Sequence, residues 1–438
     1  MRTDILIVGC GCAGLYAALQ IDRNKQVLVI TKSDAESSDS FLAQGGMCML
    51  KNDADYDSYF EDTMRAGHYE NDRHSVDIMI RSSQDLVDDL LSYDVDFARE
   101  ADGSLAFTRE GCHSDKRILF HEDTTGKEIT SKLLAEVRRR ENITLLEYTT
   151  LLDIVSDGNV CRGALIRDAQ GVIETVSADY VMLATGGIGG LYEHSTNFKH
   201  LTGDALAIAI RHNIRLENID YIQIHPTTFY SPDSTEKSFL ISESVRGEGA
   251  KLYGKDGKRF VDELLPRDVV TEAIYRQMAK DGTDYVWEDL RPIPAEELRS
   301  HFPNIVARCK EKGYDVFKEC IPVVPAQHYF MGGIEVNYQS RTSMERLYAI
   351  GETACNRVHG RNRLASNSLL ESMVFAKRAA KEICANYRRQ GHILLPADYI
   401  DAYRDEAGLK AQYKRLVLEC IQKSKNARRQ ISAKMQSA

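Results

Sequence analysis

The chain has 438 residues, a hydrophobic share of 43% and a charged share of 28%, values that are ordinary for a soluble globular enzyme. Its length favours two packed domains plus an appendage over a single simple core. The formal net charge of -9 gives no basic footprint for nucleic acid, so no nucleic-acid partner is expected.

The ten cysteines are scattered without a Cys-x-x-Cys pair, which predicts reduced thiols and a cytoplasmic location. The N-terminus begins a strand almost at once and lacks the basic and long apolar regions of a signal peptide. No stretch reaches the roughly 18 continuous apolar residues that a membrane span requires. We therefore expect no membrane span, and the motifs call for no metal.

The first 31 residues predict a βαβ unit, with strands at residues 5–8 and 27–30 and a helix that runs to Ile21. A second buried strand at residues 180–184 runs into a Gly-rich turn. A third, at residues 347–350, runs into Gly351 and lies far downstream. Because such units occur both early and late, the cofactor domain is predicted to be interrupted by an insertion.

The predicted fold class is α/β, with a Rossmann-like cofactor domain, an inserted α+β capping domain and a short C-terminal helical segment. We place the cofactor domain at residues 1–218 and 330–395, the cap at 219–329 and the terminal segment at 396–438. In the last segment Leu409, Tyr413, Leu416 and Cys420 recur at helical spacing. This pattern predicts an amphipathic helix that packs on the body.

In the pattern Gly9-x-Gly11-x-x-Gly14 the first glycine permits a tight turn, the second admits a pyrophosphate, and the third lets helix and strand pack closely. After the second strand a plain NAD site would place an acidic residue, whereas residues 31–33 are Thr-Lys-Ser. This departure argues against simple NAD binding. A second Gly-containing loop, at residues 39–46, offers backbone amides to an isoalloxazine ring.

Nine motifs occur in a fixed order along the chain. They are Gly9-Cys10-Gly11-Cys12-Ala13-Gly14, Ala43-Gln44-Gly45-Gly46, Ala184-Thr185-Gly186-Gly187, His225-Pro226-Thr227, Arg246-Gly247-Glu248-Gly249, Pro266-Arg267-Asp268, His328-Tyr329-Phe330-Met331-Gly332-Gly333, Gly351-Glu352 and Arg363-Leu364-Ala365-Ser366-Asn367-Ser368. In that combination the chain resembles the succinate dehydrogenase, fumarate reductase and L-aspartate oxidase superfamily of flavoproteins, from residue 1 to about residue 385.

The resemblance implies that FAD is the cofactor and that Glu352 contacts a flavin ribose. The residues implied at the FAD are Gly9, Cys10, Gly11, Cys12, Ala13, Gly14, Lys32, Asp39, Ser40, Phe41, Leu42, Ala43, Gln44, Gly45, Gly46, Asp204, Glu352, Ser368 and Leu369. Membrane-complex relatives attach the flavin to a histidine five residues before the Gln of the Ala-Gln-Gly-Gly motif. That position here is Asp39, so noncovalent FAD is predicted.

The same motifs offer partners for a dicarboxylate, which needs cations or donors in a low-dielectric cleft. The expected cationic set is His225, Arg267, His328 and Arg363, with Ser242 and Ser366 as hydroxyl donors. In similar enzymes the arginine at position 267 delivers a proton when fumarate is reduced. In the amino-acid direction its role is electrostatic or that of a proton shuttle, and the sequence leaves both open.

The stretch from Arg109 to Arg117, Arg-Glu-Gly-Cys-His-Ser-Asp-Lys-Arg, is similar to the L-aspartate oxidase branch of the superfamily. A carboxylate at Glu110 suits an α-ammonium group and does not suit succinate. The implied reaction is oxidation of L-aspartate to iminoaspartate by hydride transfer from C2 to flavin N5. Reoxidation by O2, giving H2O2, or by fumarate, giving succinate, is left open.

This reaction would be the first step of de novo NAD biosynthesis through quinolinate, with functional coupling to quinolinate synthase. A soluble fumarate reductase or succinate dehydrogenase subunit is the alternative enzyme. A flavin-binding regulatory protein would be expected to have lost one of the four cationic side chains, and none is lost. Arg361 stands where relatives have a small residue, so an additional cation is expected close to Arg363.

Overall fold

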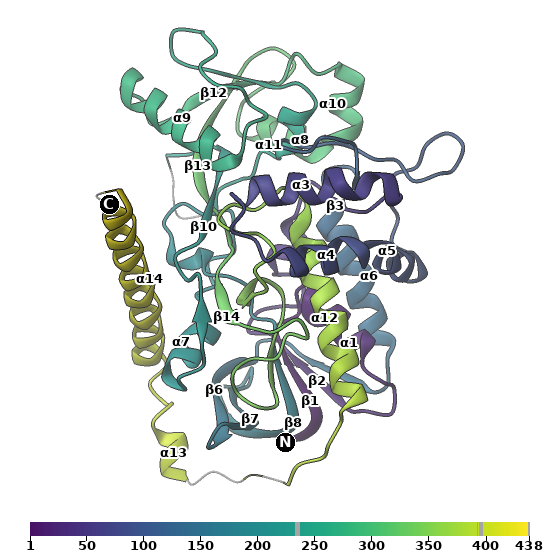
Figure 1. Ribbon diagram of the computed structural model, residues 1–438, viewed down its shortest axis with the longest axis vertical. Helices are drawn as coiled ribbons and strands as arrows, with labels where there is room; N and C mark the ends of the chain where they lie inside the picture. Colours follow the sequence, from purple (N-terminus) through teal and green to yellow (C-terminus); the bar gives the residue numbers. More distant parts are fainter. Residues whose placement is uncertain (233–236, 392, 394–396, 437–438) are drawn as a thin grey trace.

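The computed structural model describes residues 1–232, 237–391, 393 and 397–436 (Figure 1). Its largest sheet has seven strands in the order β5-β2-β1-β8-β7-β6, with β15 also beside β8. The strands are β1 Arg2–Val8, β2 Val27–Ile30, β5 Ile143–Leu146, β6 Thr150–Asp157, β7 Val160–Arg167, β8 Ile173–Leu183 and β15 Leu347–Ala349. The fold is therefore α/β, as the sequence predicts.

The strands β5, β2, β1, β8 and β15 pair in parallel, whereas β6 and β7 form an antiparallel extension. Leu183 of β8 lies in register with both Val8 of β1 and Ala349 of β15. The carboxyl ends of all three strands therefore meet at one edge of the sheet. This arrangement brings together the three strand-then-glycine units that the sequence spreads over 350 residues.

Helices cover both faces of this sheet. On one side lie α1 Cys12–Gln20, α6 Thr125–Arg139 and α12 Asn367–Ala385, and on the other lie α7 Asp204–Arg211 and α14 Glu406–Gln436. The helices α3 Tyr56–Ala66, α4 Arg73–Arg81 and α5 Ser83–Ser92 extend the first core beyond α12. The alternation along β1 explains this double cover, because Ile5 and Ile7 enter one core while Leu6 and Val8 enter the other.

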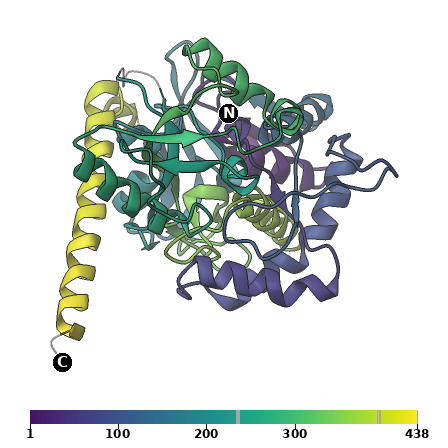
Figure 2. The same cartoon turned by 90° about the horizontal axis from the view of Figure 1, so that it is seen from above.

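The C-terminal segment is helical, as predicted, and comprises α13 Ala397–Asp401 and α14. Tyr413 of α14 is buried, together with Val417 and Ile421, in the core that α7 shares. The other predicted members of the stripe, Leu409, Leu416 and Cys420, are partly buried against the same core. Figure 2 shows α14 running along one side of the molecule and extending past it.

A four-stranded antiparallel sheet, in the order β10-β13-β12-β11, forms the end of the molecule opposite the N-terminus (Figure 1). It consists of β10 Ile222–Phe229, β11 Lys251–Tyr253, β12 Val286–Asp289 and β13 Ile321–Phe330, with helices α8 Glu243–Gly247, α9 Arg267–Asp281, α10 Ala295–His301 and α11 Pro303–Glu311. A separate apolar core holds it together. The domain boundaries at residues 218 and 329 remain predictions, and the boundary at residue 395 lies outside the described residues.

The connections carry smaller elements. They are β3 Met47–Cys48 with β4 Ile118–Leu119, the sheet of β9 Leu216–Glu217, β14 Gly333–Glu335 and β16 Ala354–Cys355, and the 3-10 turns η1 Asp53–Asp55, η2 Gly189–Leu191 and η3 Gly351–Thr353. Residues 39–46 are not wholly a loop, because α2 Asp39–Leu42 forms one helical turn. The backbone N–H of Cys12 donates to Ser40 Oγ at 3.0 Å, which ties this turn to α1.

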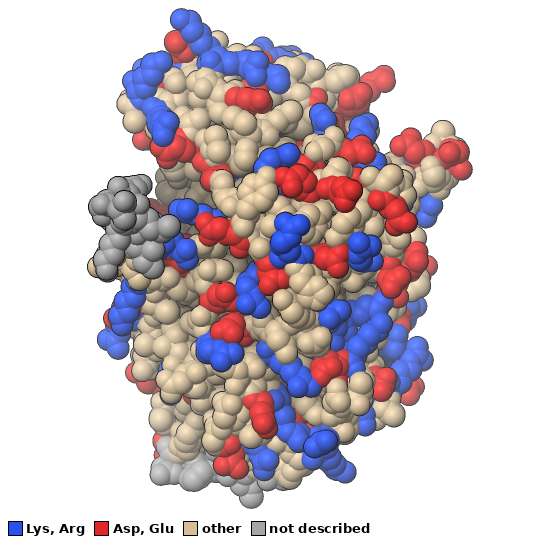
Figure 3. Space-filling view, viewed as in Figure 1, with Lys and Arg blue, Asp and Glu red and all other residues tan. Residues whose placement is uncertain are grey.

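Acidic and basic side chains are interspersed over the face shown in Figure 3 rather than gathered by sign. Among the described residues, no helix combines the length and the apolar character that crossing a bilayer needs.

Candidate active site

A cavity of about 460 Å³ lies between the glycine turns of the large sheet and the four-stranded end. The predicted cofactor residues that line it are Gly9, Cys10, Gly11, Cys12, Ala13, Lys32, Asp39, Ser40, Phe41, Leu42, Ala43, Gln44, Gly45, Gly46, Asp204, Glu352, Ser368 and Leu369. The predicted substrate residues that line it are Glu110, His225, Ser242, Arg267, His328, Arg363 and Ser366. One cavity thus unites both predicted sites.

Gly14 is the exception, because it does not line the cavity. A Cβ on Gly14 would lie 2.0 Å from the carbonyl oxygen of Gly9, so only glycine lets α1 approach the turn this closely. Gly9 itself has a φ of 114°, and a Cβ there would lie 2.1 Å from the carbonyl oxygen of Ala184. The first and third glycines therefore shape the turn, and Gly14 acts through packing rather than at the cavity wall.

Three acidic side chains mark the end of the cavity near the large sheet. Glu352 accepts a hydrogen bond from the backbone N–H of Phe330 at 2.8 Å, and burial, followed by the charge of Asp39, raises its pKa to about 8. Asp39 Oδ1 accepts from the backbone N–H of Phe198 at 3.0 Å, and burial raises the pKa of Asp39 to about 7. Asp204, at the start of α7, pairs with Lys32 at 2.7 Å.

Several buried polar atoms along this wall have no hydrogen-bond partner among the described residues. They are Ser38 Oγ, Asp39 Oδ2, Gln44 Oε1 and His225 Nε2. Buried polar atoms in proteins are normally paired, so such a set indicates a wall shaped for a ligand with many hydrogen-bonding groups. The glycine turn, the acidic side chains and these atoms fit a dinucleotide such as FAD.

Two buried arginines face the other end of the cavity. Arg267, the first residue of α9, donates from Nε to Glu243 Oε2 at 2.5 Å and from Nη1 to Gln223 Oε1 at 2.9 Å. Arg363 donates from Nε to the same Gln223 oxygen at 3.3 Å and lies 4.4 Å from the ring centre of Tyr329. Burial and the nearby Arg267 lower the pKa of Arg363 to about 10, so the Arg363 guanidinium group is charged at neutral pH.

Sequence reasoning missed Gln223, Glu243 and Tyr329. Gln223 lies two residues before His225 on β10, so strand alternation places both side chains on one face. Burial alone would raise the pKa of Glu243, but the guanidinium groups of Arg267 and Arg246 outweigh it and lower this pKa. Glu243 is therefore an ionised partner of Arg267, and its position next to Ser242 is the clue that the sequence offers.

The two predicted histidines lie on the neighbouring strands β10 and β13. The ring centres of His225 and His328 are 5.1 Å apart, and Thr196 Oγ1 lies 2.7 Å from His328 Nδ1. Burial, reinforced by the charge of Arg267, lowers both pKa values well below the ordinary range. The expectation that all four side chains are cations is thus wrong, because the set consists of two arginine cations and two neutral imidazoles.

Glu110 is buried and approaches the cavity from the loop before β4. Its Oε1 accepts from Ser244 Oγ at 2.7 Å, and its Oε2 accepts from Ser366 Oγ at 2.5 Å. No Lys, Arg or His among the described residues lies within ion-pair distance of this carboxylate. Burial, and then the negative charge of Glu243, raises the pKa of Glu110.

The two serines that were expected as donors to the substrate use their hydroxyl hydrogens within the protein. Ser366 donates to Glu110, as described above, and Ser242 Oγ donates to Ser244 Oγ at 3.2 Å. Ser242 also caps α8, because its Oγ accepts from the backbone N–H of Ser244 at 3.2 Å. Both serines line the cavity, and in this structure they orient other groups of the site.

Arg361 does not add a cation beside Arg363. Its side chain is 60% exposed and faces Glu70 at 4.0 Å, outside the cavity. The backbone explains this outcome, because Gly360 has a φ of 55° and the N–H of Arg361 donates to the carbonyl oxygen of Gly67 at 3.1 Å. The expectation from the sequence is therefore wrong.

Comparison with known proteins defines the class of this fold and site. Residues 4–369 match the family described as "FAD binding domain". The structure superposes on a quinol-fumarate reductase described "with menaquinol molecules", with a TM-score of 0.84 at 30% identity over 95% of this chain and 76% of that chain. A structure of the E. coli quinol fumarate reductase gives a TM-score of 0.83 at 30% identity, over 94% of this chain and 74% of that chain. The class is that of the FAD-binding oxidoreductases.

Within this class, two clostridial relatives are similar over most of their length. The L-aspartate oxidase of Clostridium perfringens is 49% identical over 381 residues, which are 87% of this chain and 86% of that protein. That of Clostridium acetobutylicum is 47% identical over 383 residues, which are 87% of this chain and 88% of that protein. The chain belongs to the L-aspartate oxidase family, and the resemblance seen in the sequence is confirmed.

Proposed function

We propose that this protein oxidises L-aspartate to iminoaspartate with noncovalently bound FAD. The observation that carries the proposal is the buried Glu110 carboxylate, which has no ion-pair partner among the described residues and shares a cavity wall with Arg267 and Arg363. L-aspartate has two carboxylates and one ammonium group, so its charges complement two guanidinium groups and one carboxylate. A buried charge without a partner costs several kcal/mol or more, and this substrate would provide the partner.

An unsubstituted dicarboxylate fits the same wall less well. Succinate and fumarate would satisfy the two arginines and leave Glu110 beside two further negative charges. The like charge of Glu243 already contributes to the raised pKa of Glu110, so another carboxylate nearby is unfavourable unless Glu110 takes up a proton. The charge balance of the site therefore favours an amino dicarboxylate.

Each polar side chain then has a distinct task. Arg363 and Arg267 hold the two carboxylates, and the neutral imidazoles of His225 and His328 add hydrogen bonds without adding charge. Glu110 holds the ammonium group and, with its raised pKa, is suited to accept the proton that the amine releases when C2 is oxidised. For Arg267 an electrostatic role at C3 and a proton-shuttle role both remain compatible with its position.

The cofactor residues named above would hold FAD, with the glycine turn at the pyrophosphate, Glu352 at a ribose and residues 43–46 at the isoalloxazine. When bound, FAD supplies an acceptor for the hydride from C2. Noncovalent binding follows from Asp39, since a carboxylate replaces the attachment histidine of membrane-complex relatives. Acid precipitation should release all the yellow colour into the supernatant, and flavin on the pellet would refute this point.

The test of the function is anaerobic mixing of the yellow protein with L-aspartate. Rapid bleaching of the flavin absorbance is expected, and succinate should bleach it slowly or not at all. Bleaching by succinate but not by L-aspartate would contradict the proposal and favour a fumarate reductase. Stopped-flow reoxidation with O2 and with fumarate would then show whether H2O2 or succinate is the usual product.

The proposed product indicates where the enzyme acts. Iminoaspartate is unstable and is expected to be condensed by quinolinate synthase on the way to quinolinate, as the first step of de novo NAD biosynthesis. A cytoplasmic location and functional coupling to that enzyme are part of this proposal. An assay that couples the two purified enzymes should form quinolinate from L-aspartate, and its failure would contradict the pathway assignment while leaving the oxidation itself intact.

A further inference from the structure

The loop that carries Glu110 is fastened by a buried ionic network that the proposed chemistry does not use. Thr108 and Ile118 exchange backbone hydrogen bonds of 2.9 and 3.2 Å, which close the base of a loop formed by residues 109–117. Glu110 lies near one end of this loop, and Arg117 lies at the other. The segment therefore projects as one unit toward the cavity.

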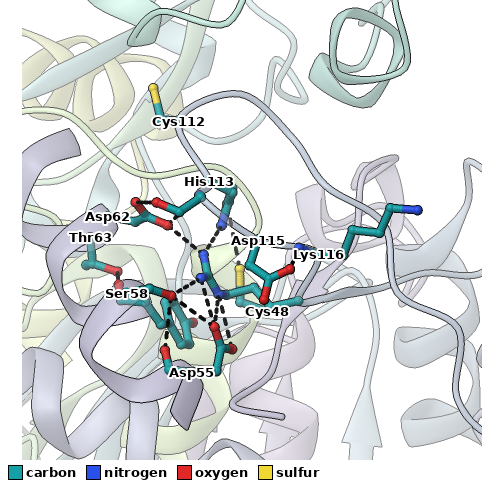
Figure 4. Close-up of polar contacts among 12 residues, drawn as sticks. Cys48, Asp55, Ser58, Asp62, Thr63, Cys112, His113, Asp115 and Lys116 are labelled. Carbon is teal, nitrogen blue, oxygen red and sulfur yellow. Dashed lines mark hydrogen bonds and ion pairs between the residues drawn. The ribbon is translucent and has the colours of Figure 1, made fainter.

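Arg117 is completely buried against the face of α3 and the residue before it. Its Nη2 lies 2.9 Å from Asp55 Oδ1, and its Nη1 lies 2.7 Å from Asp62 Oδ2. Asp62 also accepts from the backbone N–H of Ser114 at 2.6 Å and from Ser114 Oγ at 2.5 Å. Asp55, Asp62 and His113 converge in Figure 4. The Asp62 carboxylate thus holds the loop at two positions, Ser114 and Arg117.

His113 connects this network to the other side of the cavity. Its Nδ1 lies 3.1 Å from Arg117 Nη1, and its Nε2 lies 3.1 Å from the carbonyl oxygen of Ala365. A guanidinium group only donates, so Nδ1 accepts and the ring proton is on Nε2, which donates to Ala365. Burial, followed by the charge of Arg117, lowers the pKa of His113 to about 4, which keeps this neutral tautomer at neutral pH.

A second contact joins the loop to the segment that contains Ala365. Ser366 follows Ala365 and donates its hydroxyl hydrogen to Glu110 Oε2. Glu110 is three residues before His113, so the loop and the segment 363–366 are joined at two points, once through His113 and once through Glu110 itself. The same segment begins with Arg363, which faces the cavity. The His113 contact therefore fixes how far the Glu110 carboxylate lies from an arginine of the site.

We propose that Asp62, Arg117 and His113 are positioning residues that hold Glu110 at the place of the substrate ammonium group and so select an amino dicarboxylate over an unsubstituted one. This inference rests on the proposed function. It assigns a task to the His-Ser-x-x-Arg part of the motif at residues 113–117. None of these residues lines the cavity.

The test uses His113→Leu, which removes the ring contacts with Arg117, Ala365 and Cys48 and leaves Arg117 paired with its two carboxylates. We expect the kcat/KM for L-aspartate to fall about tenfold, mainly through KM, while succinate binding, measured from its perturbation of the flavin spectrum, changes less than about twofold. His113→Gln keeps an acceptor and a donor and should restore most of the loss. His121→Leu, at a partly exposed histidine of a nearby loop, is the matched control.

A double-mutant cycle with Glu110→Gln separates positioning from general support of the fold. If His113 acts through Glu110, His113→Leu should have almost no further effect on L-aspartate kinetics in the Glu110→Gln background. Multiplicative losses, or equal losses of aspartate and succinate binding, would overturn the inference while the proposed function stands. A wild-type enzyme that does not oxidise L-aspartate would overturn the proposed function and this inference together.

A second variant covers the case in which His113→Leu does not fold. Ser114→Ala removes only one of the donors to Asp62, and it should show the same aspartate-selective rise in KM at a smaller size of about threefold. An unchanged KM for L-aspartate in a folded, flavin-containing Ser114→Ala protein would count against the network as a positioning device.

Discussion

The two ends of the cavity are built by different means. At the end near the large sheet, main-chain geometry dominates, since a Cβ added to Gly9 or Gly14 would lie only 2.1 or 2.0 Å from a backbone carbonyl oxygen. At the other end, charged side chains from distant segments dominate, with Glu110, Arg267 and Arg363 each supplied by a different part of the chain. One end is a turn within a single βαβ unit, and the other is a cluster of charged side chains that come from distant parts of the chain.

This difference teaches how each end can fail. A local turn depends on space, so a single methyl group is enough to disturb it. A charged assembly depends on balance, so the loss of one charge leaves another buried without a partner. Changes at the substrate end should therefore alter turnover and selectivity while FAD stays bound, and changes at the cofactor end should do the reverse.

The largest effect is expected for Arg267→Leu. Loss of the guanidinium group removes a charge from the reacting end and leaves Glu243, among the described residues, with Arg246 at 3.5 Å as its ion-pair partner. Turnover with L-aspartate and with fumarate should fall by about 1,000-fold or more, while the flavin absorbance per protein stays the same. Arg276→Leu, on the same helix but 77% exposed, is the control. Near-normal turnover would remove Arg267 from the proposed mechanism.

The next effect in size is expected for Glu110→Gln. This change keeps the shape and removes a charge-assisted contact of roughly 1.5–3 kcal/mol, which corresponds to about a 10- to 150-fold fall in kcat/KM for L-aspartate. Fumarate has no amine, so its reduction should hold or improve, and the two activities should diverge. Glu100→Gln, at an exposed glutamate before the same loop, serves as the control. Parallel losses would mean that Glu110 supports the loop or the flavin instead.

The cofactor end is tested by Gly14→Ala. The added Cβ would meet a backbone oxygen that cannot move aside, at a cost of about 1–3 kcal/mol, or about 5- to 150-fold in FAD affinity. Turnover at saturating FAD should change little, because no charge at the substrate end is altered. Gly391→Ala, where a Cβ would meet nothing within 4 Å, is the matched control. Normal FAD affinity, measured by fluorescence titration, would show that α1 can retreat from the turn.

The last prediction concerns the pH profile of kcat/KM for L-aspartate, where the change near neutral pH is the smallest of the four effects. Pairing with the ammonium group needs ionised Glu110, whose pKa burial raises above its ordinary value of 4.5. Activity should therefore fall as the pH falls through this raised pKa, by up to about tenfold per pH unit. The pKa of Glu243 is lowered, so Glu243 stays ionised over that range. The acidic limb should disappear in Glu110→Gln, and a limb that persists unchanged would belong to another group.

Some of the site was predictable because its information is local. The βαβ unit, the glycine turn and the amphipathic C-terminal helix follow from hydrophobic periodicity and from residues that adjoin in sequence. The two wrong predictions concern properties that depend on burial and on contacts between distant residues. The charge state of His225 and His328 depends on desolvation and on Arg267, and the direction of Arg361 depends on a contact with the distant Gly67.

By itself the sequence determined the α/β class, the glycine turn and the family, because these depend on the order of residues along the chain. Only the tertiary structure decided which charges share one cavity, since Glu110 and Ser366 are 256 residues apart and meet through hydrogen bonds of the folded state. It also decided that Arg267 is paired with Glu243, whereas Glu110 forms no ion pair with any residue that the structure describes. The physical reason is that burial and the distances between charges set their free energies, and both exist only after folding.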